Sequence, residues 1–192
     1  MKNILIVGGT GTIGKAVAAA LSSRHHVILA GYKQADIQVD ASDKNSIEKM
    51  YQTVGKIDAV ISTIGHVHFA PLVDMKEELY HIGLKNKLMA QINLVLCGLH
   101  YLNAGGSFTL TSGILNRDPI ASGSSASMVN GALDAFVKAA AIEMPNNIRI
   151  NIVSPTLLSE SVERFGDYFL GFESVSAAKV ANAYVKSIER SE

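Results

Sequence analysis

Three glycines near the start of the chain could hold a phosphate group. Gly8, Gly11 and Gly14 follow the apolar residues 4–7 in KNILIVGGTGTIG, and a helical pattern of apolar residues comes directly after them. Glycine permits the positive φ of a tight turn and lets a diphosphate approach the backbone, where free N–H groups and the helix dipole favour negative charge. The pattern predicts a dinucleotide-binding site, with an ordinary glycine-rich turn as the alternative interpretation.

Two histidines, His66 and His68, could move a proton. They lie in GHVHFAPL, directly after a predicted strand. Histidine titrates near neutral pH, so such a side chain could donate a proton to a substrate. No third ligand accompanies the pair in the sequence, and no metal site is predicted. The alternative interpretation is a polar loop beside the cofactor.

The residues after the second predicted strand indicate which dinucleotide binds. The choice between NAD and NADP usually depends on the end of this strand, where an acidic side chain binds the ribose 2′-OH. Here the sequence reads LAGYK and has no acid before Asp36. Lys33 could pair with a 2′-phosphate, and the hydroxyls of Thr10 and Thr12 could add hydrogen bonds. The sequence therefore favours NADP(H), with a solvated loop lysine at position 33 as the alternative.

Strand-like and helix-like segments alternate along the chain. Apolar runs predict strands over residues 4–7, 27–30, 37–39, 59–62, 107–111 and 148–153. Helical patterns lie over residues 13–23, 44–54, 77–102, 125–143 and 177–189. Such alternation predicts an α/β fold: a single doubly wound domain over residues 1–192, with a parallel sheet and helices on both faces.

Composition excludes several classes of protein. The 17 basic and 17 acidic side chains cancel, which argues against binding to nucleic acid or to an anionic membrane. Cys97 is the only cysteine, so no internal disulfide is expected, and its apolar surroundings predict a buried thiol. The most apolar helical stretch, residues 84–102, contains Lys85 and Lys87 and should not span a bilayer. MKNILIVGG is too short before its glycines for a signal peptide, so a cytoplasmic protein is expected.

Further landmarks follow the glycine loop in order. Asp40 lies in VDASD after the third predicted strand, STIG closes the fourth at residues 62–65, and residues 148–155 read IRINIVSP. Together with the glycine loop, these motifs resemble the short-chain dehydrogenase/reductase family over nearly the whole chain. The resemblance implies a Rossmann-type sheet of seven strands, the last of them absent or very short here.

The resemblance also places the family's catalytic positions. Its tyrosine falls on Ala126 and its lysine, four residues later, falls on Asn130. Its serine falls on Gly113, beside Ser112, and its supporting asparagine falls near Asn86. Alanine has no titratable group and asparagine carries no charge, so the family's usual proton transfer has no donor here. The chain thus resembles a divergent branch that lacks the usual Ser-Tyr-Lys residues.

Two sets of candidate site residues result. The candidate catalytic residues are Ser112, Asn86, Asn130 and His66. The residues expected to contact the cofactor are Gly8, Thr10, Gly11, Thr12, Ile13, Gly14, Tyr32, Lys33, Asp40, Thr63, Gly65 and Pro155. By resemblance, Asp40 contacts the adenine amino group; a cap for the helix that begins near Lys44 is the alternative role.

The resemblance implies an NADP(H)-dependent oxidoreductase that acts on a small carbonyl or alcohol by an atypical mechanism. The alternative is a non-catalytic dinucleotide-binding protein, such as a redox sensor or an assembly partner. In the family, two long helices pair between subunits; here they are the helices from Glu77 and Ser125, which carry stripes of apolar residues at helical spacing. A homodimer or homotetramer is therefore expected, and packing of the stripes against the sheet is the alternative interpretation. The aromatic-rich residues 157–172 hold the position of the family's substrate loop and could form a partly apolar lid, or they could simply cover the core.

Overall fold

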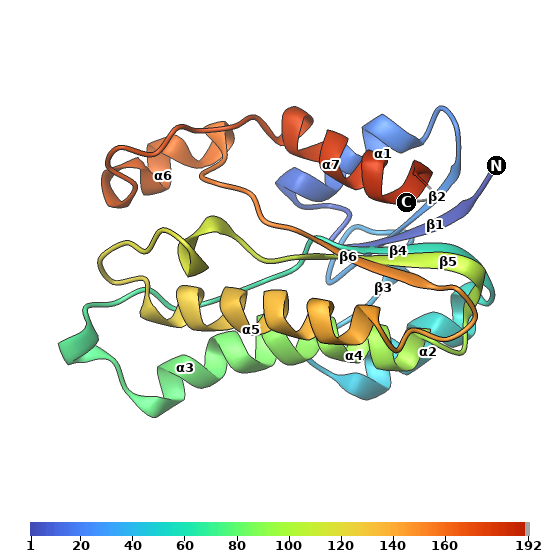
Figure 1. Cartoon of the computed structure of the whole chain (residues 1–192), viewed down its shortest axis with the longest axis horizontal. Coiled ribbons are helices and arrows are strands. Elements are labelled where there is room, and N and C mark those ends of the chain that lie inside the picture. The colour runs from blue at the N-terminus through green and yellow to red at the C-terminus, as the bar shows by residue number, and fades with distance from the viewer. Residues whose placement is uncertain (191–192) are drawn as a thin grey trace.

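The centre of the molecule is a parallel sheet with the strand order β3-β2-β1-β4-β5-β6 (Figure 1). This is a computed structural model, and it describes residues 1–190. The strands are β1 (Asn3–Val7), β2 (His26–Gly31), β3 (Ile37–Gln38), β4 (Ile57–Ser62), β5 (Leu102–Thr111) and β6 (Arg149–Val153). The predicted α/β fold with a doubly wound parallel sheet is confirmed, with six strands within the described residues.

The strand order reverses between β1 and β4. Val7 at the end of β1 lies opposite Ala30 of β2 on one side and opposite Ser62 of β4 on the other. The carboxyl ends of these three strands therefore meet at the same edge of the sheet. Ligands of open α/β sheets bind in the crevice at such a reversal.

Helices cover both faces of the sheet (Figure 1). The helices of one face are α1 (Thr12–Leu21) and α7 (Ala177–Glu189), and those of the other are α2 (Lys44–Val54), α4 (Ala90–Gly98) and α5 (Ser124–Ala141). Shorter helical segments are α3 (Glu77–Gly83), α6 (Val162–Phe165) and the 3₁₀ turns Leu72–Asp74, Ile114–Asn116, Ser159–Ser161 and Gly166–Tyr168. Within residues 1–190, no helix combines the length and the hydropathy needed to cross a bilayer.

Alternate side chains of β1 separate the core into two apolar clusters. Ile4 and Ile6 pack with α1 and α7, whereas Leu5 and Val7 pack with α2, α4 and α5. This division follows from the two-residue period of a strand. Cys97 lies buried on the α4 side as predicted, and burial raises the pKa of its thiol.

The helix predicted over residues 77–102 is wrong in two respects. A π-helical segment, Leu84–Met89, separates α3 from α4, and the helix ends at Gly98. Leu102 instead begins β5 and lies opposite Ile57 of β4. The chain turns first, where the Tyr101 N–H donates to Gly98 O at 2.9 Å. Apolar residues continue through this turn, so periodicity alone did not reveal the helix end.

The apolar stripes expected to pair subunits lie mainly in the core. Val95, Val129 and Leu133 are buried against the sheet, and Leu102 is buried at the start of β5. Leu88, Leu99, Phe136 and Ala140 are partly buried against the same cluster. Packing within one chain therefore explains the spacing of these residues. The apolar side chains exposed on these helices are others: Met89, Leu96 and Met128.

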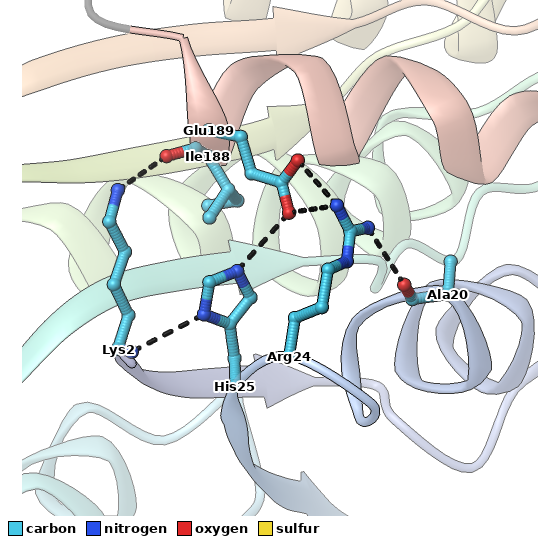
Figure 2. Close-up of polar contacts among 6 residues, drawn as sticks. All are labelled: Lys2, Ala20, Arg24, His25, Ile188 and Glu189. Atoms are coloured by element: carbon cyan, nitrogen blue, oxygen red, sulfur yellow. Dashed lines mark hydrogen bonds and ion pairs between the residues drawn. The ribbon is translucent and has the colours of Figure 1, made fainter.

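Polar contacts tie α7 to the start of the chain (Figure 2). Glu189, the last residue of α7, forms an ion pair with Arg24 at 2.6 Å and lies 3.2 Å from the His25 ring. Lys2, just before β1, donates from Nζ to Ile188 O at 2.5 Å. These contacts hold the end of α7 beside the loop between α1 and β2.

Gln91 on α4 fixes the end of β5. Its fully buried amide accepts the Thr111 N–H at 2.9 Å and donates to Thr111 O at 2.8 Å. Pairing between β4 and β5 has already ended at Thr109, so the amide takes the place of a strand on that side of Thr111. A helix side chain therefore positions the residues that follow β5.

We expect Gln91→Leu to destabilise the fold because it leaves two buried backbone groups of Thr111 without a partner. An unsatisfied buried group costs about 1–3 kcal/mol, so the free energy of unfolding should fall by about 2–4 kcal/mol. Urea unfolding followed by circular dichroism measures the change. Gln52→Leu, at an exposed position of α2, is the control and should change this energy by less than about 0.5 kcal/mol. Equal stability of the two variants would contradict the role given to Gln91.

Candidate functional site

A tight turn connects β1 to α1. Gly8 has φ +85°, in the left-handed region that glycine adopts without strain. Its N–H donates to Ala30 O on β2 at 2.8 Å, and the Gly11 N–H donates to Gly8 O at 3.0 Å. Gly11 precedes α1 without a side-chain cap, and the first turn of α1 carries no acidic side chain. The N–H groups of that turn therefore offer their partial positive charge to an anionic ligand.

Close packing of α1 against the turn explains the third glycine. A Cβ on Gly14 would lie 2.2 Å from Gly8 O and 2.7 Å from Gly9 Cα. Both are backbone atoms that cannot move aside without moving the turn. Thr63, directly after β4, donates its hydroxyl to Gly8 O at 3.1 Å. The turn is thus held by α1 and by the neighbouring strand.

A cleft of about 310 Å³ opens beside this turn, at the carboxyl ends of β1, β2 and β4. Seven residues predicted from the sequence line it together: Gly8, Thr10, Tyr32, Asp40, Gly65, His66 and Asn86. Backbone N–H groups, hydroxyls and a carboxylate thus surround one cavity at the strand-order reversal. This donor and acceptor set fits a dinucleotide, whose diphosphate needs donors and whose ribose needs both.

The other predicted cofactor residues surround this cleft or lie farther along the sheet edge. Thr12, Ile13 and Gly14 form the first turn of α1. Lys33 is exposed in the loop after β2. Pro155 follows β6, and its carbonyl accepts the Ile114 N–H at 3.0 Å. Contacts of these residues with a cofactor stay predictions.

Two aspartates near the cleft have defined hydrogen bonds. Asp36 accepts the Leu29 N–H at 2.8 Å, so its carboxylate is bound to β2. Asp40 accepts from the hydroxyl and N–H of Ser42, and these bonds hold the pKa of the Asp40 carboxyl below its usual value. Asp43 provides the side-chain cap of α2. Asp40 therefore lines the cleft and does not cap the helix.

Ser112 and Asn130, two candidate catalytic residues, lie near one another beyond the end of β5. Ser112 donates its N–H to Val153 O at 2.9 Å, and its buried hydroxyl has no hydrogen-bond partner within residues 1–190. Asn130 is buried on α5, and a Cβ on Gly113 would lie 2.9 Å from its Nδ2. Ala126 is buried four residues earlier on the same helix.

Asn86 and His66, the other two candidates, lie at the dinucleotide cleft. The Asn86 amide donates to Ile82 O of its own helix at 2.9 Å. His66 is exposed at the cleft, and His68 is partly buried. Among residues 1–190, no group of three or more His, Cys, Asp and Glu side chains could hold a metal ion. The catalytic roles of these residues stay predictions.

Lys87 is not among the residues that the sequence predicts for the site, but in the structure it lies beside Ser112 and Asn130. Its Nζ donates to Asn130 Oδ1 at 2.6 Å and to Ser112 O at 3.0 Å. Burial lowers the pKa of Lys87 to about 8, although the negative charge of Asp134 acts in the opposite direction. A lysine within an apolar helical run, next to the candidate Asn86, is the sequence signal that could have indicated it.

Comparison with known proteins agrees with this geometry. A family model described as enoyl-(acyl carrier protein) reductase, one of the short-chain dehydrogenase models, matches residues 9–189. The chain belongs to the short-chain dehydrogenase/reductase family. Family membership supports an oxidoreductase activity that uses a dinucleotide cofactor.

Three similar proteins illustrate the range of similarity. The crystal structure of the protein lin1944 from Listeria innocua is 48% identical, with a TM-score of 0.98 over 100% of this chain and 96% of that one. A small-chain dehydrogenase in complex with NADPH is 29% identical, with a TM-score of 0.87 over 98% and 91% of the two chains. An L-xylulose reductase from Mesocricetus auratus is 25% identical over 85% of this chain and 74% of that enzyme.

The predicted substrate loop of this chain contacts the loop after β4. Phe165, the last residue of α6, lies 6.4 Å from Phe69 between ring centroids. Phe169 and Phe172 pack edge to face at 5.3 Å. Aromatic side chains from two distant segments thus meet on the carboxyl side of the sheet, where the loop was expected to form a lid.

We expect Gly14→Ala to destabilise the protein, because the new Cβ would lie 2.2 Å from Gly8 O and would push α1 from the turn. Overpacking of this kind costs about 1–3 kcal/mol of unfolding free energy, measurable by urea unfolding. Gly131→Ala is the matched control on α5, where the nearest atom to the new Cβ would be 3.8 Å away. Alanine favours a helix, so this control should stabilise by up to about 1 kcal/mol. A stable Gly14→Ala variant would contradict the packing argument.

Proposed function

We propose that the chain is an NADP(H)-dependent reductase of small carbonyl compounds, which oxidises the matching alcohols in reverse. The observation that carries the cofactor choice is the Asp36 carboxylate, which binds the Leu29 N–H. An acid facing the ribose would repel a 2′-phosphate, and Asp36 is already engaged elsewhere. The NADPH complex of the small-chain dehydrogenase and the name of the L-xylulose reductase support the same proposal.

The residues of the cleft bind different parts of the cofactor in this proposal. The turn at Gly8 and the first turn of α1 receive the diphosphate, and Thr10 adds a hydroxyl. Lys33 provides the positive charge for a 2′-phosphate, and Asp40 accepts a hydrogen bond from the adenine amino group. When bound, the nicotinamide supplies hydride to a carbonyl carbon.

Proton transfer in this proposal does not use a tyrosine of α5. The sequence of α5, SSASMVNGALDAFVKAAA, contains none, and Ala126 stands where the family resemblance places it. Two titratable side chains beside the cleft could supply the proton instead, namely His66 at its exposed rim and Lys87 beside Asn130. This is the atypical feature of the proposed mechanism.

The cofactor proposal predicts selective stabilisation by NADP(H). A ligand at about one hundred times its dissociation constant adds about 2.7 kcal/mol to the stability of the folded state. We expect NADPH to raise the unfolding temperature more than NADH at equal concentration, measured by circular dichroism. Lys33→Ala should weaken NADPH binding by roughly tenfold or more, through the loss of a charge-assisted hydrogen bond.

Lys49→Ala, at an exposed position of α2, is the control and should leave the NADPH effect intact. An equal shift with NADH would contradict the NADP preference alone. No shift with either dinucleotide would contradict cofactor binding itself.

The carbonyl proposal predicts consumption of NADPH with a small aldehyde, ketone or ketose. A panel of such compounds, followed by absorbance of the reduced nicotinamide, should include at least one that turns over at about 1 per second or faster. A protein that binds NADPH tightly but reduces none of the panel would favour the non-catalytic alternative, a redox sensor or an assembly partner.

The proposed assembly is a homodimer or homotetramer built on α4 and α5. Support comes from the apolar side chains that these helices and the adjoining π-helical segment leave exposed: Met89, Leu96 and Met128 are 43%, 50% and 41% exposed. Burial of such side chains against a second copy would remove apolar surface from water.

A further inference from the structure

Lys87 reaches the end of β5 from an irregular part of its helix. It lies within the π-helical segment Leu84–Met89, and such segments are frequent at functional sites. Within residues 1–190, its ammonium makes two hydrogen bonds, to Asn130 Oδ1 at 2.6 Å and to Ser112 O at 3.0 Å. An ammonium has three N–H donors, so one remains for a ligand.

Two glycines make room for this arrangement. A Cβ on Gly65 would lie 2.8 Å from Lys87 Cδ, and a Cβ on Gly113 would lie 2.9 Å from Asn130 Nδ2. Gly65 and Asn86, the residue before Lys87, both line the dinucleotide cleft. The stem of Lys87 therefore packs against Gly65 of the cleft, and its ammonium binds just beyond the end of β5.

The surroundings of Lys87 determine how readily its ammonium gives up a proton. Burial lowers its pKa to about 8, and Asp134 on α5 acts against this decrease. The Asp134 carboxylate also binds Asn116 and Arg117. Lys85, on the same helical segment, is exposed, and His66 lies at the rim of the cleft. At neutral pH Lys87 is therefore mainly protonated, with an acidity near that of an effective general acid.

We propose that Lys87 is the general acid of the reductase, with its Nζ donating a proton to the carbonyl oxygen of the substrate. The inference rests on the proposed NADP(H)-dependent function. Hydride from the reduced nicotinamide forms the new C–H bond, and the π electron pair of the carbonyl moves to oxygen. That oxygen takes a proton from the Lys87 ammonium, which leaves an alcohol, the oxidised nicotinamide and a neutral amine. Water then reprotonates the amine.

Lys87 suits this role better than its neighbours. Ser112 has a buried hydroxyl, and hydroxyls are poor acids at neutral pH. His66 is exposed and has no hydrogen bond that fixes its ring among the described contacts. Lys87 is held by two acceptors from different elements, so its third N–H has a fixed direction. Lys87 thus reaches the proposed substrate site from the π-helical segment, and Asn130 of α5 orients its ammonium.

The test follows the titration of Lys87 directly, by NMR of protein labelled with ¹³C-lysine. The Lys87 Cε signal is the one that both Lys87→Arg and Lys87→Gln remove, so either variant suffices for the assignment. Lys138→Arg assigns the signal of an exposed reference lysine. We expect Lys87 to titrate near pH 8. Its pKa should be about one unit lower with NADP⁺ than with NADPH, because only the oxidised nicotinamide carries a nearby positive charge.

Asn130→Asp is a second, independent way to change the pKa of Lys87. A carboxylate beside Nζ should raise the pKa of Lys87 by about one unit or more, while the signal of Lys138 stays in place. A Lys87 ammonium that lies away from the nicotinamide would show the same pKa in both dinucleotide complexes, and that result would overturn the inference. Titration of Lys87 together with Lys138 would overturn it as well.

Failure of the proposed function gives a different result. If neither dinucleotide stabilises the wild-type protein against heat, the reductase proposal and this inference both fall. If NADPH stabilises the wild-type protein but the pKa of Lys87 is the same with NADPH and with NADP⁺, only the role proposed for Lys87 is contradicted.

Discussion

The close approach of α1 to the turn after β1 governs both the binding turn and the core beside it. Gly14 has no room for a Cβ, because Gly8 O and Gly9 Cα occupy that space. The contact directs the first turn of α1 toward the cleft. It also sets the distance at which Val17 and Leu21 of α1 pack on β1 and on α7. One backbone contact thus positions the turn that we propose receives the diphosphate and one side of the core.

A second constraint acts at the end of β5, where polar groups enter an apolar interior. Gln91 satisfies the backbone of Thr111, and Lys87, one turn earlier, binds the carbonyl of Ser112. Buried polar groups are costly unless they are hydrogen-bonded, so these contacts fix the strand end firmly. The same helical region therefore supports β5 and brings a positive charge beside the cleft. Stability and the proposed proton transfer share this short stretch of chain.

Local patterns predicted most of the fold. Apolar runs indicated the strands, and helical periodicity indicated α1, α2, α5 and α7 to within a few residues, because each of these elements ends at a clear polar or turn signal. The end of α4 was missed because Leu99, Tyr101 and Leu102 continue the apolar pattern through a turn into β5. The stripes on α4 and α5 had two interpretations, subunit pairing or packing on the sheet. Packing explains most of their residues.

The turn beside the cleft could be predicted from the sequence because it is local: Gly8, Gly11 and Gly14 lie within one strand–turn–helix unit. The distant side chains that meet beside the cleft are a property of the folded chain. Lys87 and Asn130 are separated by 43 residues, and Lys87 and Ser112 by 25. Such contacts depend on how helices cross the sheet and on which glycines leave space between them. The sequence shows Lys87 only as a lysine within an apolar helical run, because spacing along the chain does not determine that geometry. Its partners Asn130 and Ser112 were identified only from the packed helices.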